Sequence, residues 1–299
     1  MKQTVPRVAA VHDLSCVGRC SLTVIMPVLA AMGIQACPLP TAVLSTHLGG
    51  FREVAFCDFT DRIASFYRHW LQEGVAFDCI YSGFLASAGQ IDVVLEFIGE
   101  FSACHPLVLV DPVMGDEGRL YSVYEGDMQA RMKSLVKRAH IITPNYTEAG
   151  FLLGETYRPV CPDPGQMAAW LRGLADMGPA QVVITGIPLG DGLLLTVAYD
   201  RLADRYCQTA VRQIPVRYPG TGDIFASVLA GVLLRGGSLE RAVEQAVNFV
   251  FHCVRQTYDA GTPIREGVLL EAALPQLLAS GSDSTEQGGR VCRKNGTST

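Results

Sequence analysis

Residues 107–112 have the sequence LVLVDP, a short apolar run that ends at a carboxylate and a proline. A run of this length and composition predicts a buried strand over 107–110. Apolar residues at helical spacing follow over 128–135, and a second apolar run at 140–143 ends at Pro144-Asn145. This strand–helix–strand order predicts two parallel strands joined by a right-handed crossover, the repeating unit of an α/β fold.

The same alternation continues in both directions along the chain. Further strands are predicted at 7–12, 34–37, 77–81 and 181–185, with antiparallel additions at 192–199 and 206–214. Helices are predicted from an N-cap at Ser21 to Met32, from Asp61 and from Ser87, and three more close the chain. We therefore expect an α/β fold of three layers, in which helices cover both faces of a mainly parallel central sheet. In such a sheet, ligands bind outside the carboxyl ends of the strands.

The composition excludes several classes of protein. Of the 299 residues, 49% are hydrophobic and 18% are charged, which favours a globular chain with a large core over a disordered one. A net charge of −5 argues against a nucleic-acid partner, because proteins that bind phosphate backbones carry a basic surface. No apolar stretch approaches the roughly 20 residues that cross a membrane. One domain is expected over residues 1–280, and the polar, Gly/Ser-rich segment 281–299 is expected to be a disordered tail.

The ten cysteines favour a reducing compartment. They are scattered, include no C-x-x-C pair, and several lie inside apolar runs, where a thiol packs as a small hydrophobe. Cys16 and Cys20 have no second pair at metal-ligand spacing, so a zinc site is not expected there. His12 and Asp13 interrupt the first apolar run too early for a signal peptide. We therefore expect reduced thiols and a cytoplasmic protein.

The sharpest local pattern is Gly220-Thr221-Gly222-Asp223, which directly precedes an apolar helix. Two glycines allow a tight turn, and the helix N-terminus offers unpaired N–H groups to an anion. An aspartate at this place should stay ionised, because the positive end of the helix dipole favours its charged form. The pattern suits phosphoryl transfer, with the N–H groups holding the moving phosphoryl group and Asp223 accepting the proton of the attacking hydroxyl. An ordinary loop with a capping aspartate is the alternative.

Two further polar groups follow the ends of predicted strands. Asp111 follows the strand at 107–110, and Asn145 and Glu148 follow the next strand, three residues apart. Oxygen ligands of this kind suit Mg²⁺, which is usually held partly through water. The alternatives are a turn or capping role for Asp111 and a first-turn position in a helix for Glu148.

Five motifs occur in the order found in one known superfamily. They are His12-Asp13-Leu14-Ser15-x-x-Gly18, PLPTAVLSTH at 38–47, Asp111-Pro112-Val113-Met114-Gly115, Thr143-Pro144-Asn145-Tyr146-Thr147-Glu148 and Gly220-Thr221-Gly222-Asp223. Over residues 7–278 the chain resembles the ribokinase superfamily and, within it, the pyridoxal kinase branch. The resemblance implies a ribokinase-like fold and a phosphotransferase that uses ATP and Mg²⁺. Its substrate would be the 5′-hydroxymethyl group of pyridoxal, pyridoxamine or pyridoxine.

The resemblance also implies a role for each matched residue. Asp223 would be the catalytic base, and the anion hole would be formed by Gly220, Thr221 and Gly222. The nucleotide would be held by Asp111, Thr143, Asn145, Glu148, Thr185 and Gly186, with Asp111 and Glu148 binding the metal, largely through water. The vitamer ring would be faced by Asp13, Ser15, Thr46 and His47, under a flap formed by residues 114–121. A homodimer with no membrane or nucleic-acid partner is implied as well.

Several alternatives stay open at this point. A hydroxymethylpyrimidine or hydroxymethylpyrimidine-phosphate kinase is the nearest rival, although that branch tends to carry Cys where Asp223 stands. The sugar-clamping motifs of sugar kinases are not evident near the N-terminus, and an intact Asp223 disfavours a non-catalytic vitamin-B6-binding protein. Asp13 could pair with the amine of pyridoxamine or accept a hydrogen bond from a ring hydroxyl. His47 could be structural, and Arg19 could either pair with phosphate or lie on the surface.

Overall fold

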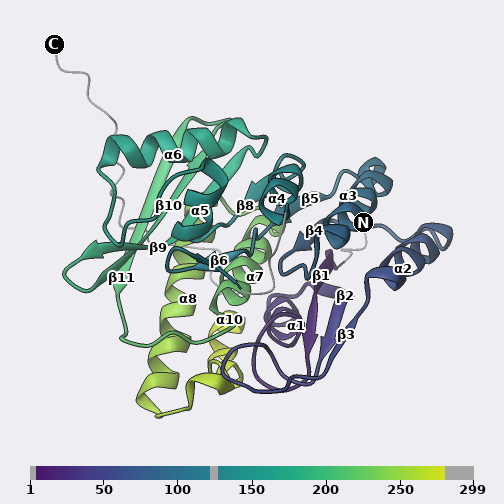
Figure 1. Cartoon of the computed structure of the whole chain (residues 1–299), viewed down its shortest axis with the longest axis horizontal. Helices are drawn as coiled ribbons and strands as arrows, with labels where there is room; N and C mark the ends of the chain where they lie inside the picture. The colour runs from purple at the N-terminus through teal and green to yellow at the C-terminus, as the bar shows by residue number, and fades with distance from the viewer. Residues whose placement is uncertain (1–4, 122–126, 280–299) are drawn as a thin grey trace.

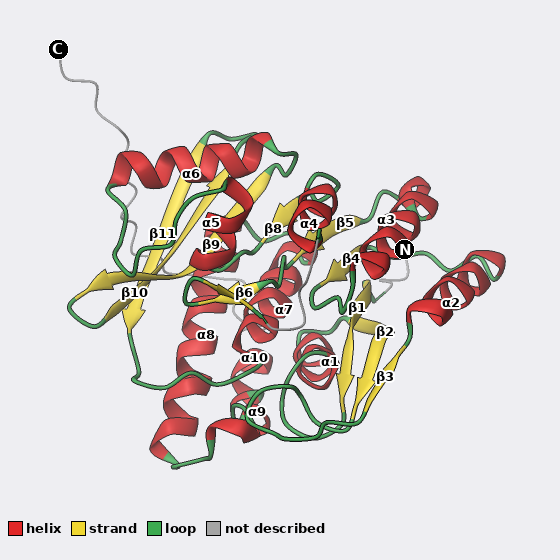
Figure 2. Ribbon diagram, viewed as in Figure 1, coloured by secondary structure: helices red, strands yellow, loops and turns green. Residues whose placement is uncertain are grey.

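A nine-stranded sheet runs through the middle of the molecule, and helices cover both of its faces (Figure 1). The structure is a computed structural model and describes residues 5–121 and 127–279. The expected three-layer α/β architecture is confirmed, as the separation of helices and strands in Figure 2 shows. The segment 281–299, for which we expected a disordered tail, lies outside the described residues.

The sheet is parallel at its centre and antiparallel at both edges. Its strand order is β11–β10–β9–β8–β5–β4–β1–β2–β3, and all pairs from β9 to β2 are parallel. β10 and β11 add antiparallel strands beside β9, and β3 pairs antiparallel with β2. The strands of this sheet are β1 (Arg7–Ser15), β2 (Gln35–Leu44), β3 (Phe56–Asp58), β4 (Cys79–Ser82), β5 (Leu107–Val110), β8 (Ile141–Ile142), β9 (Gln181–Gly190), β10 (Leu193–Asp200) and β11 (Arg205–Arg212). A separate hairpin consists of β6 (Gly115–Asp116) and β7 (Arg119–Leu120).

The helices divide between the two faces. One face is covered by α2 (Thr60–Gln72), α3 (Ala88–Glu100), α4 (Met128–Val136), α5 (Tyr146–Leu153) and α6 (Pro164–Asp176). The other is covered by α1 (Leu22–Ala31), α7 (Thr221–Leu234), α8 (Leu239–Asp259), α9 (Leu270–Ala273) and α10 (Pro275–Ala279). Two single turns of 3₁₀ helix lie at Ser102–Cys104 and Ile264–Glu266.

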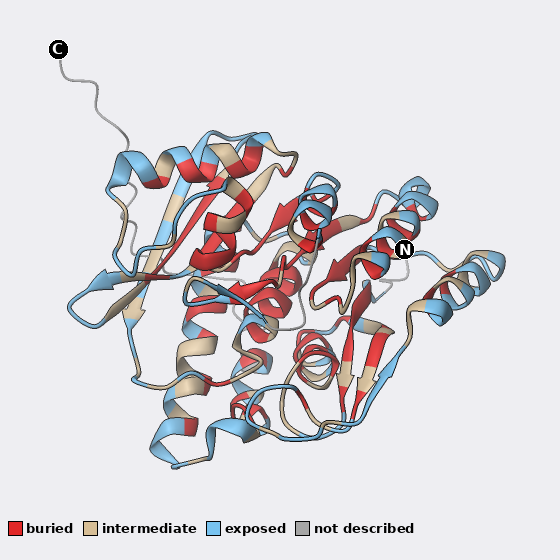
Figure 3. Cartoon of the chain, in the orientation of Figure 1, coloured by how far each residue is buried: buried red, intermediate tan, exposed pale blue. Residues whose placement is uncertain are grey.

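The sheet separates two apolar cores, which explains why its central strands are almost continuously apolar. In β1, Ala9 and Val11 belong to the core under α2–α6, whereas Val8 and Ala10 belong to the core under α1 and α7–α10. Strands that are covered on both faces need apolar residues on both faces. Figure 3 shows the burial concentrated in the central strands and in α7, in which residues 224–232 are all buried. A helix buried on all sides fixes the position of the chain segment that precedes it.

Most predicted elements are confirmed, with differences at their ends. β5 covers the predicted residues 107–110, β1 extends beyond the predicted end at residue 12, and the Ser87 hydroxyl caps α3 as expected. Ser21 precedes α1, but its hydroxyl makes no capping hydrogen bond. The sequence patterns do not predict β3, the β6–β7 hairpin or α6, and the last of the three expected C-terminal helices is divided into α9 and α10. Among the described residues, no helix is both long enough and apolar enough to span a membrane.

Candidate active site

The candidate residues gather at the carboxyl ends of the parallel strands. Asp13 lies near the end of β1, Asp111 directly follows β5, and Asn145 follows β8 and forms an isolated parallel bridge with Thr185 in β9. Asp223 reaches the same edge from the first turn of α7. The fold therefore brings together polar groups that are up to 210 residues apart, from 13 to 223, in the sequence.

The turn before α7 has two glycines, of which one is required by the backbone conformation and by a close contact. Gly220 is the N-cap of α7 with a φ of 80°, and a Cβ there would lie 2.3 Å from the carbonyl oxygen of Arg19. Gly222 lies beside Asp111, whose Oδ2 would be 3.6 Å from an added Cβ. The first N–H groups of α7, which can bind an anion, therefore lie next to the Asp111 carboxylate.

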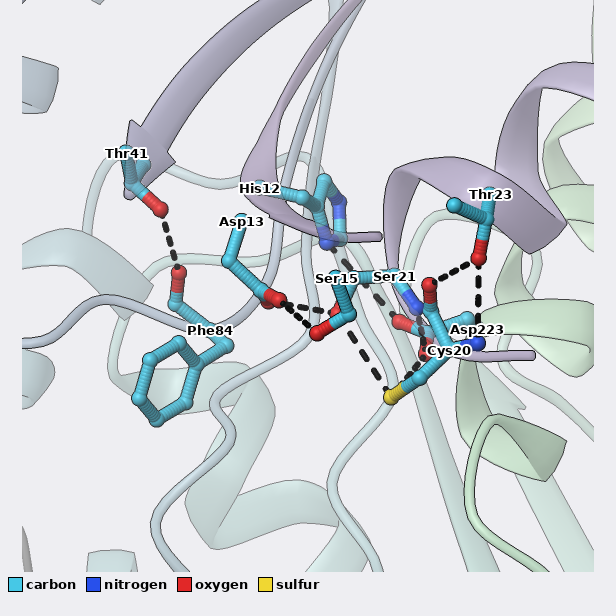
Figure 4. Close-up of polar contacts among 9 residues, drawn as sticks. All are labelled: His12, Asp13, Ser15, Cys20, Ser21, Thr23, Thr41, Phe84 and Asp223. Atoms are coloured by element: carbon cyan, nitrogen blue, oxygen red, sulfur yellow. Dashed lines mark hydrogen bonds and ion pairs between the residues drawn. The ribbon is translucent and has the colours of Figure 1, made fainter. Parts of the chain in front are cut away.

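Asp223 is held on one oxygen by the loop between β1 and α1. Its Oδ2 accepts a hydrogen bond of 2.8 Å from the Ser21 N–H and lies 3.7 Å from the Cys20 Sγ, as Figure 4 shows. Its Oδ1 lies 3.8 Å from Nδ1 of His12. Burial lowers the pKa of the fully buried His12 to about 3, so the imidazole is neutral and this contact is not an ion pair. No hydrogen bond to Oδ1 of Asp223 occurs within the described part of the chain.

The protonation of Asp223 differs from our expectation. We expected the helix N-terminus to keep this carboxylate ionised, but burial raises its pKa to about 7, with a further contribution from the charge of Asp13. The hydrogen bond from Ser21 opposes this shift without cancelling it. The expectation was wrong because the side chain is only 13% exposed, and desolvation outweighs the helix dipole.

Both carboxylate oxygens of Asp13 accept hydrogen bonds from nearby serine hydroxyls. Its Oδ1 accepts from the Ser21 hydroxyl at 2.5 Å, and its Oδ2 accepts from the Ser15 hydroxyl at 2.8 Å (Figure 4). Asp13 is 5% exposed and Ser15 is fully buried. Burial raises the pKa of Asp13, against the lowering effect of these two hydrogen bonds.

Asn145 and Glu148 form a capping box at the start of α5. The Asn145 side chain accepts from the Glu148 N–H at 2.9 Å, and Oε2 of Glu148 accepts from the Asn145 N–H at 2.8 Å. The same two side chains hold the hairpin: Oε1 of Glu148 accepts from the Met114 N–H at 3.0 Å, and the Asn145 amide donates to the Gly115 carbonyl at 2.8 Å. Burial raises the pKa of Glu148 to about 8.

Asp111 completes a group of buried carboxylates. It is 8% exposed, and its pKa lies well above the usual range because of burial and of the nearby charges of Glu148 and Asp223. The Thr143 hydroxyl lowers that pKa. Three buried acids that repel one another form a site that a cation would stabilise. The described residues contain no preformed cluster of three or more His, Cys, Asp or Glu side chains at metal-binding geometry.

Of three further candidates in the described part of the chain, His47 and Arg19 are bound by other groups of the protein and Thr46 is not. His47 is 4% exposed; its Nδ1 accepts from the Gly49 N–H at 3.0 Å, so its Nε2–H donates to the Arg265 carbonyl at 2.7 Å. The Thr46 hydroxyl is buried and has no partner among the described residues. Arg19 pairs with Glu271 at 2.8 Å, which supports its surface role over a contact with phosphate.

A cavity of about 540 Å³ opens beside the turn that carries Gly220. Its walls come from three loops and include Gly49, Gly50, Arg217, Pro219 and Arg265. The same loops hold His47, so the cavity lies between the loop after β2 and the segment that leads into α7. It is large enough for a substituted aromatic ring.

Sequence patterns miss three groups at this site. His12, Cys20 and Ser21 all approach Asp223, but their partner is more than 200 residues away in the sequence. For Ser21, the sequence pattern predicts only a helix cap. Its φ of 52° in a non-glycine residue is visible only in the folded chain.

Comparisons with known proteins show which family the chain belongs to. The family described as phosphomethylpyrimidine kinase matches residues 26–266 of the chain. The chain belongs to this family. A pyridoxine/pyridoxal/pyridoxamine kinase of Bordetella avium is 32% identical over 264 residues, which are 84% of this chain and 85% of that protein.

Two solved structures of similar proteins match the chain over most of its length. A Bacteroides thetaiotaomicron protein, crystallised in one form with pyridoxal, is 42% identical with a TM-score of 0.87, covering 92% of this chain and 96% of that one. The pyridoxal kinase of Lactobacillus plantarum is 31% identical with a TM-score of 0.85, covering 95% of this chain and all of that one (100%). The resemblance to the pyridoxal kinase branch of the ribokinase superfamily is therefore confirmed.

Proposed function

We propose that this chain is an ATP-dependent kinase that phosphorylates the 5′-hydroxymethyl group of vitamin B6 vitamers. The observation that carries the proposal is the position of Asp223 in the first turn of α7, with Oδ2 anchored by Ser21 and Oδ1 open. A carboxylate held in this way beside unpaired helix N–H groups can take a proton where a phosphoryl group arrives. The vitamin-B6 kinases among its relatives support the choice of substrate.

In this mechanism, each part of the turn has its own task. Asp223 accepts the hydroxyl proton of the substrate through Oδ1 while the oxygen attacks the γ-phosphoryl group. The N–H groups of Gly220, Thr221 and Gly222 stabilise the negative charge that moves with that group. A base with a pKa of about 7 is well matched to neutral pH, because a large share of it is ionised there and it still binds a proton readily.

The nucleotide would bind along the neighbouring strand ends. Thr143, Asn145, Thr185 and Gly186 lie next to one another there, and Gly186 has a φ of 70° with open space around it. Asp111 would hold Mg²⁺ directly or through water, with Glu148 behind it; bound Mg²⁺ would neutralise phosphate charge. Burial raises the pKa values of both acids, and a bound cation would stabilise their charged forms. Glu148 already accepts three backbone hydrogen bonds, from Met114, Gly115 and Asn145, which favours a contact through water.

The vitamer ring would lie on the side of the cavity lined by Gly49 and Pro219. Of the four residues expected to face it, Thr46 has a hydroxyl without a partner among the described residues, which a ring substituent could bind. His47, Asp13 and Ser15 hold the surrounding loops through the hydrogen bonds described above. We propose that these three residues support the walls of the pocket and do not contact the ring directly.

A hydroxymethylpyrimidine or hydroxymethylpyrimidine-phosphate kinase is the second candidate, since the matching family carries that description. A coupled assay with pyridoxal, pyridoxamine, pyridoxine, hydroxymethylpyrimidine and ribose separates the candidates. We expect turnover of at least one vitamer to exceed that of the other two compounds. Preference for the pyrimidine would replace the proposal by the second candidate. The resemblance further supports a cytoplasmic homodimer, which sedimentation and cell fractionation would test.

The role of Asp223 has a direct test. Asp223→Asn keeps the shape of the side chain and an acceptor for the Ser21 N–H but cannot take up a proton. We expect kcat to fall by about two to four orders of magnitude, with little change in KM for ATP or in thermal stability. An Asn variant that retains more than about a tenth of wild-type turnover would show that Asp223 is only a helix-terminal residue.

A further inference from the structure

Ser21 combines three features that a helix cap does not need. Its backbone N–H donates to Oδ2 of Asp223, its hydroxyl donates to Oδ1 of Asp13, and its side chain makes no capping hydrogen bond to α1. Figure 4 shows Ser21 between the two carboxylates, and the Ser15 hydroxyl donates to the other oxygen of Asp13. Ser21 thus connects the two acids through its backbone on one side and its hydroxyl on the other.

The backbone of Ser21 is strained. Its φ of 52° and ψ of −131° lie in a region that favours glycine and is unfavourable for a residue with a side chain. The same loop has glycine at another position of positive φ, Gly18, where a Cβ would lie 2.5 Å from the His47 ring, so a side chain is retained at Ser21 although its φ is also positive. A serine in a strained conformation points to a task for its hydroxyl, which is the hydrogen bond to Asp13.

The strain and the two hydrogen bonds have one geometric result. Because the Ser21 hydroxyl is bound to Asp13, the peptide plane of Ser21 cannot turn its N–H away from Asp223. Oδ2 of Asp223 is therefore fixed, and Oδ1, which accepts no hydrogen bond within the described residues, is the oxygen left to react. Asp13 is 5% exposed and both of its oxygens accept hydrogen bonds from serine hydroxyls, so it is poorly placed to meet a substrate amine.

We propose that Ser21 is a positioning residue for the catalytic base: Asp13 holds the Ser21 hydroxyl so that the Ser21 N–H orients Asp223 with Oδ1 toward the substrate hydroxyl. Asp13 acts through Ser21 and does not select among vitamers. This inference rests on the proposed role of Asp223 as the base. It replaces the sequence-based alternative in which Asp13 pairs with the amine of pyridoxamine.

Substitutions at Ser21 separate positioning from folding. Ser21→Ala removes the hydroxyl and keeps the strain, whereas Ser21→Gly removes both. We expect both variants to lose about tenfold in kcat while KM for ATP is unchanged. Both variants lose the hydrogen bond to Asp13, but only Ser21→Gly relieves the strain, so Ser21→Gly should have a higher melting temperature than Ser21→Ala. The two variants would then differ in stability while they share the same loss of kcat, which a purely structural role does not produce.

The matched control is Ser238→Ala. Ser238 is the N-cap of α8, and its hydroxyl accepts from the Arg241 N–H, near the opposite end of α7 from Asp223. Losing that cap should lower the melting temperature without changing kcat. If Ser21→Ala behaves like Ser238→Ala, with lower stability and full kcat per folded molecule, the proposal is overturned.

Asp13→Asn distinguishes positioning from recognition of the substrate. We expect kcat to fall by a similar factor for pyridoxal, pyridoxamine and pyridoxine, because the change acts through Asp223. A change in the ratio of pyridoxamine to pyridoxal turnover would overturn the proposal and indicate that Asp13 contacts the substrate directly.

A double variant that combines Ser21→Ala with Asp223→Asn distinguishes a failure of this inference from a failure of the proposed function. In the Asp223→Asn background, Ser21→Ala should cause no further loss beyond about twofold, since the base it positions is gone. A further tenfold loss would overturn the positioning role. If Asp223→Asn alone keeps wild-type turnover, the base assignment itself fails. If it loses turnover while the Ser21 variants do not, only the positioning role fails.

Discussion

Asp223 lies where the dipole of α7 should stabilise its negative charge, yet its pKa rises to about 7. A helix dipole contributes about 0.3–1 kcal/mol to a nearby charge, which is less than burial can cost a carboxylate. The charge of Asp13, on the other side of Ser21, adds to the shift. Burial therefore sets the proton affinity of Asp223, and the hydrogen bond from Ser21 keeps that affinity from rising further.

At the residue scale, this pKa predicts the pH dependence of catalysis. Protonated Asp223 cannot accept the substrate proton, so kcat/KM should fall as pH drops below about 7, by about tenfold for each pH unit. The measurement is a pH series for the wild type, with Asp223→Asn as the control, in which the remaining activity should lack this acid limb. A wild-type profile that is flat from pH 8 to pH 5, about two units below the pKa, would contradict the assignment.

The β6–β7 hairpin depends on two elements that are remote in sequence. The capping box of α5 holds its base through Glu148 and Asn145, and the Thr147 hydroxyl accepts from the Gly118 N–H at 3.0 Å. Arg217, three residues before Gly220, pairs with Asp116 at 2.7 Å and with Glu117 at 3.0 Å. Both ion pairs are solvent-exposed and each adds little stability. The buried contacts at Glu148 are therefore the ones that fix the hairpin against the start of α5.

At the element scale, Glu148→Gln tests this anchoring. The new side-chain amide would turn its NH₂ group toward the N–H of either Met114 or Asn145, which leaves one buried backbone donor unpaired. We expect a loss of about 1–3 kcal/mol in stability and a weaker dependence of turnover on Mg²⁺, with vitamer binding largely intact. Chemical denaturation and Mg²⁺ titrations provide the measurements. Glu96→Gln, at the exposed pair with Arg68, is the control and should change neither; unchanged Mg²⁺ curves for Glu148→Gln would remove Glu148 from the site.

The sequence predicted those elements whose pattern is long and apolar. The strands at 107–110 and 7–12 and the helix after Ser87 could be located from local patterns alone. The start of α6 has a local signal in Asp163-Pro164, where the Asp163 side chain caps the helix, although the patterns used above do not predict this helix. β3, β6 and β7 span only two or three residues each, which is too short for an alternating pattern to show.

The candidate site was predicted in its location but not in its contacts. Strand ends and the GTGD turn placed Asp13, Asp111 and Asp223 at one edge of the sheet, because parallel strands must end together. Local patterns cannot show that Asp13 binds Ser21, or that Ser21 then binds Asp223, since these contacts depend on the exact path of the loop before α1. The same holds for His47, whose two ring nitrogens are taken by Gly49 and Arg265.

At the scale of the whole molecule, the sheet acts as the frame of the site. Its two faces are sealed by separate apolar cores, so the carboxyl edge is the place where buried acids and open helix N–H groups meet. The C-terminal segment contributes to this edge from outside the sheet. The carbonyl oxygen of Arg265 binds His47, and that of Glu266 binds the N–H and side chain of Arg19. The loops around the site are therefore fully held only when the segment that contains Arg265 and Glu266 has packed against them.

This arrangement predicts where the chain can be shortened. Every residue assigned to the site and both cores lie within residues 5–279, and the polar segment 281–299 has no apolar periodicity with which to pack. Removing 281–299 should change stability by less than about 1 kcal/mol and leave kcat as it is. As a control at the end of the same chain, Leu277→Ala should cost about 2–5 kcal/mol, because Leu277 is 2% exposed and belongs to the core under α1 and α7–α10. Thermal and urea unfolding of the two variants beside the full chain make the comparison. A truncated chain that loses as much stability as Leu277→Ala would place the segment in the folded body and move the boundary of the domain beyond residue 280.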